Sequence, residues 1–390
     1  MTQWQTMKLG ELAEVSRGST ITRKEVFPGE VPVIAGGQTP SCYHNVSNRQ
    51  GKTITVSASG AYAGYVQYFE IPIFASDCST IKIKDENMTS SKFLFYMLLA
   101  SQTEIYAFQR GSGQPHVYPS QLVGLDIPTP TIDEQHKIVE LLEDHLSRLD
   151  AALVDVKQAK MKAAQFRRSL LQAAFTGNLD YDGASLFAEW QTKTIGEIAD
   201  TQLGKMLNKG KQTGENTVPY LRSVNVQWGR VDTSDLNQMD ILPSELAKFT
   251  IKKGDLLICE GGESGRVAIW DREEPIGFQN ALHRVRAKSE VTNKYLYYYF
   301  EWLVKNQLIE HLFNGVTIKH FPQENLRSVE VSYPAIDEQR VIVEHLEGHL
   351  SRLDASVSLA DAMEKQSNGL RRSLLQSAFT GQLTKEVVNV

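Results

Sequence analysis

The sequence predicts an α+β protein: two mixed α/β domains, separated and followed by two long helices that pack as an antiparallel coiled coil with pseudo-twofold symmetry. Three observations predict this fold. A long segment occurs twice in the chain, both copies have helical signals with an apolar seam, and the stretch before each copy is long enough for one domain.

The repeated segment runs from Ile132 to Leu179 and again from Ile336 to Leu383, a constant offset of 204 residues. Of its 48 aligned positions, 27 are identical without a gap. Weaker sequence similarity extends the duplication to the domains. The similar segments are Trp4-Gln5-Thr6 with Trp190-Gln191-Thr192, residues 31–34 with 218–221, and residues 91–96 with 293–298. The predicted order is a domain at 1–130, a helix at 131–180, a domain at 181–335, and a helix with a C-terminal tail at 336–390.

Both copies of the segment carry helix signals at their ends. A proline-bearing stretch precedes each copy, and the acidic pairs at 133–134 and 337–338 fall in the first turn, where the helix dipole favours negative charge. Gly177 and Gly381 follow the last apolar residues, and glycine is a common helix stop. Each copy therefore reads as one helix of roughly 40 residues, about 60 Å long.

An apolar seam with alternating spacings of four and three residues runs along each helix, which is typical of a coiled coil. Its members are Leu142, Leu146, Leu149 and Leu153 in the first copy, and Leu346, Leu350, Leu353 and Val357 in the second. The seam must be buried, and the other copy is the nearest partner. The alternative is that each helix packs on its own domain as a core helix.

The composition excludes several classes of protein. The 41 basic and 46 acidic residues give a net charge of −5, and no segment is strongly basic, so any DNA binding must use local patches or a more basic partner. The three cysteines have no metal spacing and are expected to be free thiols. With no long apolar run and no signal pattern at Met1–Leu12, a cytoplasmic protein is expected.

Motifs of catalysis are absent as well. The sequence has no Asn/Asp-Pro-Pro-aromatic motif for a flipped adenine, no glycine-rich dinucleotide fingerprint, no phosphate-binding loop, and no zinc spacing among its nine histidines. We therefore expect a non-catalytic chain that binds no cofactor or metal of its own.

Two unlike domains on a repeated spacer suit a protein that reads a split DNA sequence, because a fixed interface between two reading heads sets the spacing of half-sites. At this level the whole chain resembles the specificity subunit of a type I restriction-modification system. The resemblance rests on IDEQ at 132–135 and 336–339, RRSLLQ at 167–172 and 371–376, and AFTG at 174–177 and 378–381.

The resemblance implies a division of labour. Each variable domain would be a target-recognition domain that reads one half of an asymmetric bipartite site in double-stranded DNA. The helices would set the gap and dock two methyltransferase subunits, which bind S-adenosylmethionine and methylate adenine. Restriction subunits, which use ATP and Mg, would complete the complex.

Candidate DNA-binding residues lie in polar loops at matching places in both domains. Base edges need hydrogen-bonding side chains, and phosphates need cations or hydroxyls. The candidates are Gln38, Arg110, Gln114, His116 and Tyr118 in the first domain, and Lys205, Lys209, Arg222, Asn225, Lys319 and His320 in the second. Arg110, Lys205 and Lys209 are the expected phosphate contacts.

Three alternatives stay open on the sequence alone. The chain could be a coiled-coil scaffold for proteins with no role on DNA, which its acidic balance would suit. It could be a nuclease or methyltransferase in its own right, although the motifs are missing. It could also serve a related system in which the methyltransferase and nuclease are fused.

Overall fold

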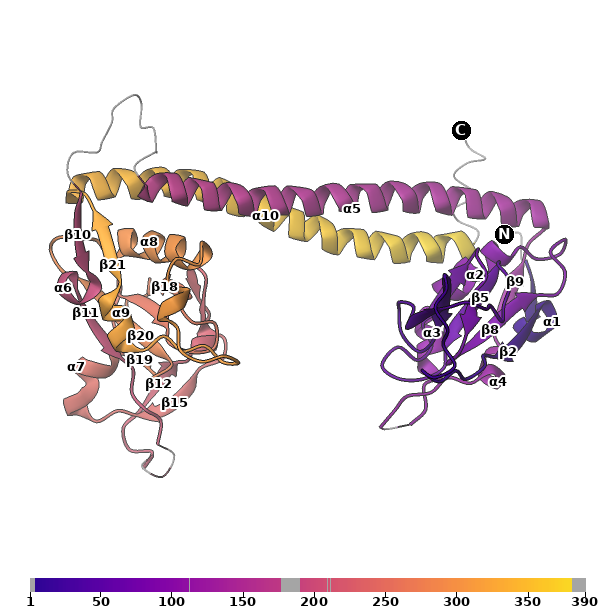
Figure 1. Ribbon diagram of the computed structural model, residues 1–390, viewed down its shortest axis with the longest axis horizontal. Coiled ribbons are helices and arrows are strands. Elements are labelled where there is room, and N and C mark those ends of the chain that lie inside the picture. Colours follow the sequence, from indigo (N-terminus) through magenta and orange to yellow (C-terminus); the bar gives the residue numbers. More distant parts are fainter. Residues whose placement is uncertain (1–3, 112, 177–189, 209, 211, 381–390) are drawn as a thin grey trace. The chain divides into compact units, whose positions relative to one another are not determined.

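The computed structural model describes residues 4–111, 113–176, 190–208, 210 and 212–380 (Figure 1). It divides into two compact units. Unit 1 comprises Met1–Lys157 and Asp361–Val390, and unit 2 comprises Gln158–Ala360. Each unit combines helices with antiparallel and mixed sheets, so the predicted mixture of helix and sheet in two domains is confirmed.

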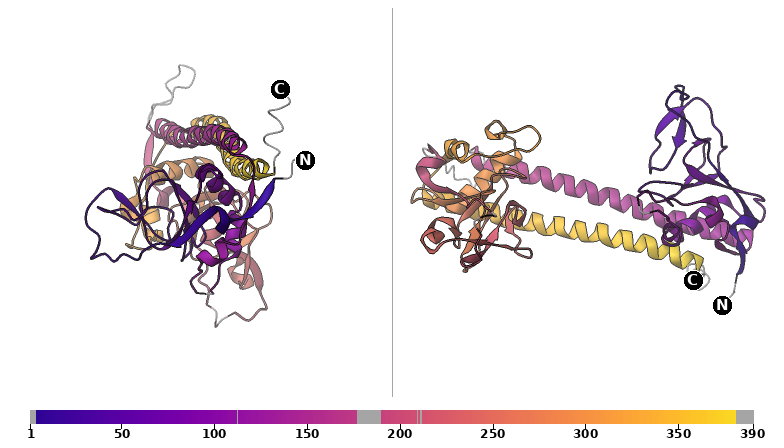
Figure 2. Two further views of the ribbon diagram at one scale, coloured as in Figure 1. Left: turned by 90° about the vertical axis from the view of Figure 1, so that its right-hand side faces the viewer. Right: turned by 90° about the horizontal axis from the view of Figure 1, so that it is seen from below.

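Two long helices connect the units, and each is one uninterrupted ribbon (Figure 2). Helix α5 spans Ile132–Phe175 and helix α10 spans Ile336–Phe379. Thr131 caps α5, because its backbone N–H donates to the Glu134 carboxylate at 3.0 Å and its hydroxyl accepts from the Glu134 N–H at 3.4 Å. The expected stops, Gly177 and Gly381, lie outside the described residues.

Unit 1 contains a four-stranded antiparallel sheet in the order β2-β8-β5-β6, a three-stranded sheet β4-β3-β7, and the pair β1-β9. Its elements before α5 are β1 (Gln5–Lys8), α1 (Leu9–Leu12), β2 (Ala13–Arg17), β3 (Val31–Ile34), β4 (Cys42–His44), β5 (Thr53–Ser57), β6 (Val66–Phe69), β7 (Phe74–Ala75), β8 (Cys78–Ile83), α2 (Ser91–Ala100), α3 (Gln102–Ala107), α4 (Pro119–Leu122) and β9 (Asp126–Thr129). Strand β5, in which the first four residues are β-branched, is buried at all five positions, as a central strand should be.

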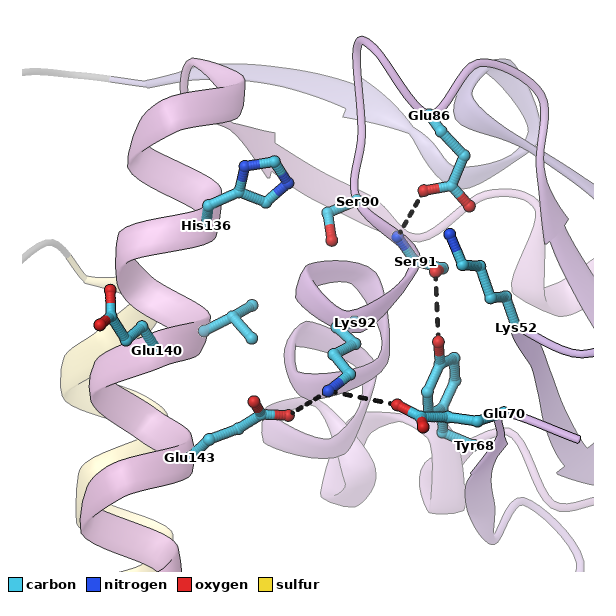
Figure 3. A pocket seen from close by; sticks show the side chains of 11 residues that line it. Lys52, Tyr68, Glu70, Glu86, Ser90, Ser91, Lys92, His136, Glu140 and Glu143 are labelled. Atoms are coloured by element: carbon cyan, nitrogen blue, oxygen red, sulfur yellow. Dashed lines mark hydrogen bonds and ion pairs between the residues drawn. The ribbon is translucent and has the colours of Figure 1, made fainter.

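The start of α5 and the end of α10 pack on α2 in unit 1. One buried cluster contains Phe93 of α2, Ile138 and Leu142 of α5, and Leu375 and Ala378 of α10. Lys92 adds an ion pair at this junction, with its Nζ 2.8 Å from Glu143 of α5 and 3.2 Å from Glu70 (Figure 3). The start of α5 therefore contacts both its own domain and the other helix.

Unit 2 repeats this topology in a divergent sequence. Its four-stranded sheet β11-β20-β17-β18 matches β2-β8-β5-β6, and a second sheet has the order β15-β12-β19-β16. The elements are β10 (Gln191–Thr194), α6 (Ile195–Ile198), β11 (Ala199–Leu203), β12 (Thr217–Leu221), β13 (Val226–Gln227), β14 (Arg230–Val231), β15 (Asn237–Asp240), α7 (Leu246–Phe249), β16 (Thr250–Ile251), β17 (Leu256–Cys259), β18 (Val267–Ile269), β19 (Ile276–Phe278), β20 (Leu282–Ala287), α8 (Asn293–Lys305), α9 (Gln323–Ser328) and β21 (Glu330–Tyr333).

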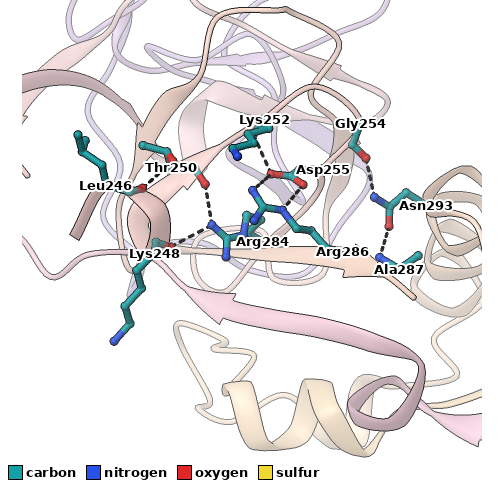
Figure 4. A network of polar contacts seen from close by, with 10 residues as sticks. All are labelled: Leu246, Lys248, Thr250, Lys252, Gly254, Asp255, Arg284, Arg286, Ala287 and Asn293. Atoms are coloured by element: carbon teal, nitrogen blue, oxygen red, sulfur yellow. Dashed lines mark hydrogen bonds and ion pairs between the residues drawn. The ribbon is translucent and has the colours of Figure 1, made fainter. Parts of the chain in front are cut away.

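Two arginines of β20 tie the sheets of unit 2 together (Figure 4). Arg284 donates from Nη1 to the backbone oxygens of Lys248 at 3.0 Å and Thr250 at 2.6 Å. Arg286 forms a bidentate pair with Asp255, at 2.6 and 2.8 Å. These bonds anchor the α7–β16 segment to the central sheet, so we assign both arginines a structural role.

The helix junction of unit 2 mirrors that of unit 1. Its core joins Phe175 at the end of α5 with Tyr295 of α8 and with Ile342 and Leu346 of α10. Lys294 pairs with Glu347 at 2.8 Å, as Lys92 pairs with Glu143. In both units the helix that follows a domain and the end of the other helix together bury the aromatic face of α2 or α8.

Candidate nucleic-acid interface

In unit 1, three of the predicted loops meet at one edge of the sheets. The segment after β5 is bonded to the 110–118 loop, because the Gly60 N–H donates to the Pro115 oxygen at 3.1 Å and the Val117 N–H donates to the Ala58 oxygen at 3.0 Å. The Ser76 N–H donates to the oxygen of Ile34 at 2.7 Å, which brings the end of β3 to the same edge. Backbone bonds thus assemble the loops while leaving side chains available.

The candidate side chains of unit 1 are largely accessible. Gln38, Arg110, Gln114 and Tyr118 are exposed, and His116 is half-buried. The rings of His116 and Tyr118 are stacked, with centroids 6.0 Å apart and an interplanar angle of 18°. Arg110 and His116 also exchange backbone hydrogen bonds at 3.1 and 2.9 Å. The loop therefore presents an amide, a guanidinium and an aromatic stack close together in the chain.

Unit 2 assembles its edge by the same backbone contacts. The Phe321 N–H donates to the Glu260 oxygen at 2.6 Å, and the Gln279 N–H donates to the Leu221 oxygen at 3.0 Å. His320 forms isolated bridges with Gly261 and Asn314, as His116 does with Ser59 and Arg110. The two histidines therefore occupy equivalent positions, although the loop sequences around them share little.

Several candidates of unit 2 are engaged within the unit. The Lys205 ammonium forms an ion pair with Glu245 and lies 5.5 Å from the Phe249 ring centroid. The hydrogen bond from Lys205 is the main reason that the pKa of Glu245 lies below its ordinary value. Arg222 contacts Asp235 at 2.7 Å, and Lys319 contacts Glu310 at 3.2 Å. Any contact of these cations with DNA would therefore compete with a carboxylate of the same unit.

Asn225 is used to shape its loop. Its side chain is buried, and Oδ1 accepts from the Arg222 N–H at 2.9 Å. Its Nδ2 donates to the backbone oxygens of Asp232 at 3.0 Å and Asp235 at 2.9 Å. An amide with all these bonds has little hydrogen-bonding capacity left for a base, so Asn225 shapes the loop rather than contacting DNA. Lys209 lies outside the described residues.

The candidate residues chosen from the sequence did not include the acidic residues at the edge of unit 2. Nδ1 of His320 lies 3.2 Å from both carboxylate oxygens of Glu260. Asp235 lies beside Arg222, and neither acid stands out by motif or spacing. A carboxylate at a reading edge can accept a hydrogen bond from the amino group of cytosine. The signal that could have pointed to Glu260 is its place directly after the buried strand β17.

The seam residues of the long helices divide into two sets. Leu142, Leu146, Leu346 and Leu350 are buried, whereas Leu149, Leu153, Leu353 and Val357 are half-buried. Leu142 packs in the unit 1 cluster with α2 and α10, and Leu346 and Leu350 belong to the core of unit 2. The buried residues of the seam therefore pack both on the other long helix and on a domain, so the two arrangements considered for the seam occur together.

The buried glutamine of each IDEQ motif is a structural residue that the sequence analysis missed. Gln135 accepts from the Ser90 N–H at 2.9 Å, and its amide donates to the oxygens of Met88 and Pro130, both at 2.9 Å. Gln339 repeats the pattern with Thr292, Glu290 and Pro334, at 3.0, 2.8 and 2.9 Å. Both glutamines are fully buried and lock the start of a long helix to its domain.

Among the residues that the structure describes, no group of three or more His, Cys, Asp or Glu side chains could hold a metal ion. Within the same residues, no helix combines the length and the apolar character needed to cross a bilayer. All three cysteines are free, and Cys78 and Cys259 are buried.

Two units of one topology, each with a loop edge assembled by equivalent backbone bonds, define a protein with two recognition heads of common design. A model of the type I restriction modification DNA specificity domain matches residues 1–156 and 188–358. The chain belongs to this family. The expected role in DNA recognition by a type I restriction-modification specificity subunit, without catalysis of its own, is thereby confirmed, and a scaffold without a DNA role is not favoured.

Named relatives agree with the family assignment. The chain is 24% identical to the type I restriction enzyme EcoKI specificity subunit of Escherichia coli K12, over 85% of this chain and 74% of the relative. It is 23% identical to the StySPI specificity subunit of Salmonella potsdam, with the same coverage.

Solved structures share the fold. A chain from a structural study of complex assembly and conformational transition of the type I R-M system aligns with a TM-score of 0.73 at 18% identity, covering 98% of this chain and 99% of that one. The HsdS subunit from Thermoanaerobacter tengcongensis aligns with a TM-score of 0.57 at 17% identity, covering 98% and 97%.

Proposed function

We propose that each unit reads one half of a split, asymmetric site in double-stranded DNA. The observation that carries this proposal is the pair of loop edges, assembled by equivalent backbone bonds but lined by different side chains. Equivalent backbones place both edges against a duplex in the same way, and different side chains select different bases. The predicted boundaries of the reading domains, 1–130 and 181–335, belong to this proposal.

Contacts to DNA follow from the side chains at each edge. In unit 1, Gln114 is suited to a bidentate contact with adenine, His116 and Tyr118 to base-edge contacts, and Arg110 to phosphate. Gln38 would add a further contact. In unit 2, Arg222, Lys319 and His320 would reach bases and Lys205 and Lys209 would reach phosphates. Because Lys205, Arg222 and Lys319 are paired with carboxylates, binding by unit 2 exchanges ion pairs.

We further propose that α5 and α10 form an antiparallel coiled coil with pseudo-twofold symmetry, which sets the gap between the half-sites. Reciprocal contacts support it: Arg167 of α5 bonds to Asp354 of α10 inside unit 2, and Arg371 of α10 bonds to Asp150 of α5 inside unit 1. The two contacts exchange under the 204-residue offset of the repeat. A symmetric spacer presents two equivalent surfaces to partners.

Two methyltransferase subunits would dock on this spacer in the cytoplasm. They would bind S-adenosylmethionine and methylate adenine, and restriction subunits that use ATP and Mg would join them. This chain would hold no cofactor of its own. The near-neutral balance of charge favours tight DNA binding only once these partners add basic surface.

Mapping methylated adenine in DNA from cells that carry this chain with its methyltransferase partner tests the proposal. We expect one split motif with an unread gap of about one helical turn. Cells with the methyltransferase alone are the control and should lack the motif. Methylation without any split motif would contradict the proposal.

A further inference from the structure

Each unit has a groove where its domain meets the long helix that follows. Groove A, in unit 1, is a cavity of about 730 Å³ whose lining includes Ser90, Ser91, Lys92, Val139, Glu140 and Glu143 (Figure 3). Groove B, in unit 2, is a cavity of about 640 Å³ whose lining includes Thr292, Asn293, Lys294, Val343, Glu344 and Glu347. These six positions correspond one to one in the duplicated sequence.

The lysine that the two grooves share is already matched by carboxylates, whereas Lys52, which lines groove A alone, forms no ion pair with a residue that the structure describes. In groove A, Lys92 lies between Glu143 and Glu70, and in groove B, Lys294 pairs with Glu347. The charge of Arg340 at the rim of groove B is met by Asp337 at 2.8 Å.

Glu140 and Glu344 differ from these residues. Both are exposed at the helix rim of their grooves, and neither forms a hydrogen bond or ion pair with any residue that the structure describes.

Retention of these two acids has no explanation within the fold. The domains have diverged almost completely between the copies, and exposed helix positions tolerate substitution at little cost in stability. Contacts within the fold explain why several of the shared helix residues are kept: Gln135 and Gln339 are buried, and Glu143 and Glu347 pair with lysines. Glu140 and Glu344 have no such contact. We therefore attribute the retention of both acids to a partner that contacts them in the same way.

We infer that grooves A and B each receive the same basic side chain from one copy of the methyltransferase partner, with Glu140 or Glu344 as its counter-ion. This inference rests on the proposed function and adds where that partner docks. A lysine or arginine fits because Lys92 and Lys294 already pair with Glu143 and Glu347, which leaves Glu140 and Glu344 as the unpaired carboxylates that the two grooves share. The side chains beside the rim differ, His136 in groove A and Arg340 in groove B.

Charge reversal of each acid tests the inference. Wild-type chain, Glu140→Arg, Glu344→Arg and the double variant are mixed with the purified methyltransferase subunit of the same system, and the mass of each complex is measured by native mass spectrometry and sedimentation. We expect two copies on the wild-type chain, one on each single variant and none on the double variant at concentrations where the wild type is saturated. A rim charge of this kind should change the affinity of its copy by on the order of tenfold or more.

The matched control is Asp155→Arg, which reverses an exposed acid on α5 outside the groove lining. It should retain two copies, and unchanged thermal unfolding of all variants shows that the fold is intact. If both single variants bound two copies of the methyltransferase with wild-type affinity, the groove assignment would be overturned, while the proposed function would stand. Loss of both copies from each single variant would overturn it too, since the grooves would not act separately. If the wild-type chain bound no methyltransferase at all, the proposed function itself would fail.

Discussion

Arg167 of α5 and Asp354 of α10 form an ion pair in unit 2, with Nη1 and Oδ1 2.8 Å apart. The same guanidinium makes a bidentate contact with Glu301 of α8, at 2.6 and 3.1 Å. In unit 1 Arg371 occupies the equivalent place and bonds to Asp150, but the position that corresponds to Glu301 is Leu99. The junction of unit 2 thus contains a buried carboxylate at a position where unit 1 has an apolar side chain.

Replacing Arg167 by leucine should destabilise unit 2 by about 3–5 kcal/mol, because the Glu301 carboxylate, 1% exposed, would lose its counter-ion. The double variant Arg167→Leu/Glu301→Leu replaces the buried ion pair by two apolar side chains and should recover most of that loss. Urea unfolding of the four chains of this double-mutant cycle gives both quantities. A double variant as unstable as Arg167→Leu alone would contradict the assignment of the loss to the uncompensated Glu301 charge.

Substitution of Gln135 or Gln339 by alanine should lower the free energy of unfolding by about 2–3 kcal/mol, since each amide satisfies buried backbone groups. Gln158→Ala is the control, because that glutamine is exposed on α5. The change should appear in hydrogen exchange as faster opening of the first turns of the affected helix only. Equal exchange in both helices of a single variant would argue against the local role.

Alanine at Gln114 and His116 together should weaken recognition of one half-site by about 1–3 kcal/mol for each base contact removed. Alanine at His320 should affect the other half-site. Methylation of a library with all single substitutions of the split site measures both half-sites in one experiment. If either variant relaxed both halves to the same extent, the two units would not read independently.

The three thiols should differ in reactivity toward Ellman's reagent. Burial raises the pKa of Cys78 to about 12 and that of Cys259 to about 11, while Cys42 is half-buried. Because the thiolate is the reactive form, native protein at pH 8 should release one fast equivalent, and denatured protein three. Cys42→Ser should abolish the fast phase, and a fast phase that survives this change would be inconsistent with the buried environment of the other two.

His283 should make unit 2 less stable in mild acid. Burial lowers the pKa of its ring below the ordinary value of 6.5, and Nε2 lies 2.7 Å from the Phe321 oxygen. As the pH falls below about 6.5, the unfolded chain binds a proton that the folded chain refuses, so stability is lost with acid. His283→Asn should flatten the pH dependence of urea unfolding between pH 7 and 5. His311→Asn, at an exposed site, should not change it.

Much of the architecture could be predicted because sequence repeats and local signals indicate where the helices and strands lie. Both long helices begin at the isoleucine of IDEQ, as expected from the proline before it and the acids after it. The echo between residues 31–34 and 218–221 marks strands β3 and β12, each of which pairs in parallel with a later strand, β7 or β19. Local sequence decides such elements because hydrogen bonding and alternating burial act over a few residues.

The candidate site was only partly predictable, because the partner of a side chain depends on contacts distant in sequence. The polar stretches that follow the apolar strands supplied the candidate loops, and the structure places these loops at one edge of each unit. The burial of Asn225, the carboxylates beside Arg222 and Lys205, and the pairing of His320 with Glu260 join segments up to 60 residues apart. No pattern of residue types within one loop reports such pairs.

The sequence by itself determined the duplication, the two helices and the division between constant spacer and divergent domains, since repeat identity and helical periodicity are written along the chain. Only the tertiary structure decided that the end of α5 packs on α8 with Phe175, that the end of α10 packs on α2 with Phe379, and that grooves A and B form at the two junctions. The physical reason is that an apolar seam specifies a need for burial but not the surface that meets it, and that surface exists only after the chain has folded.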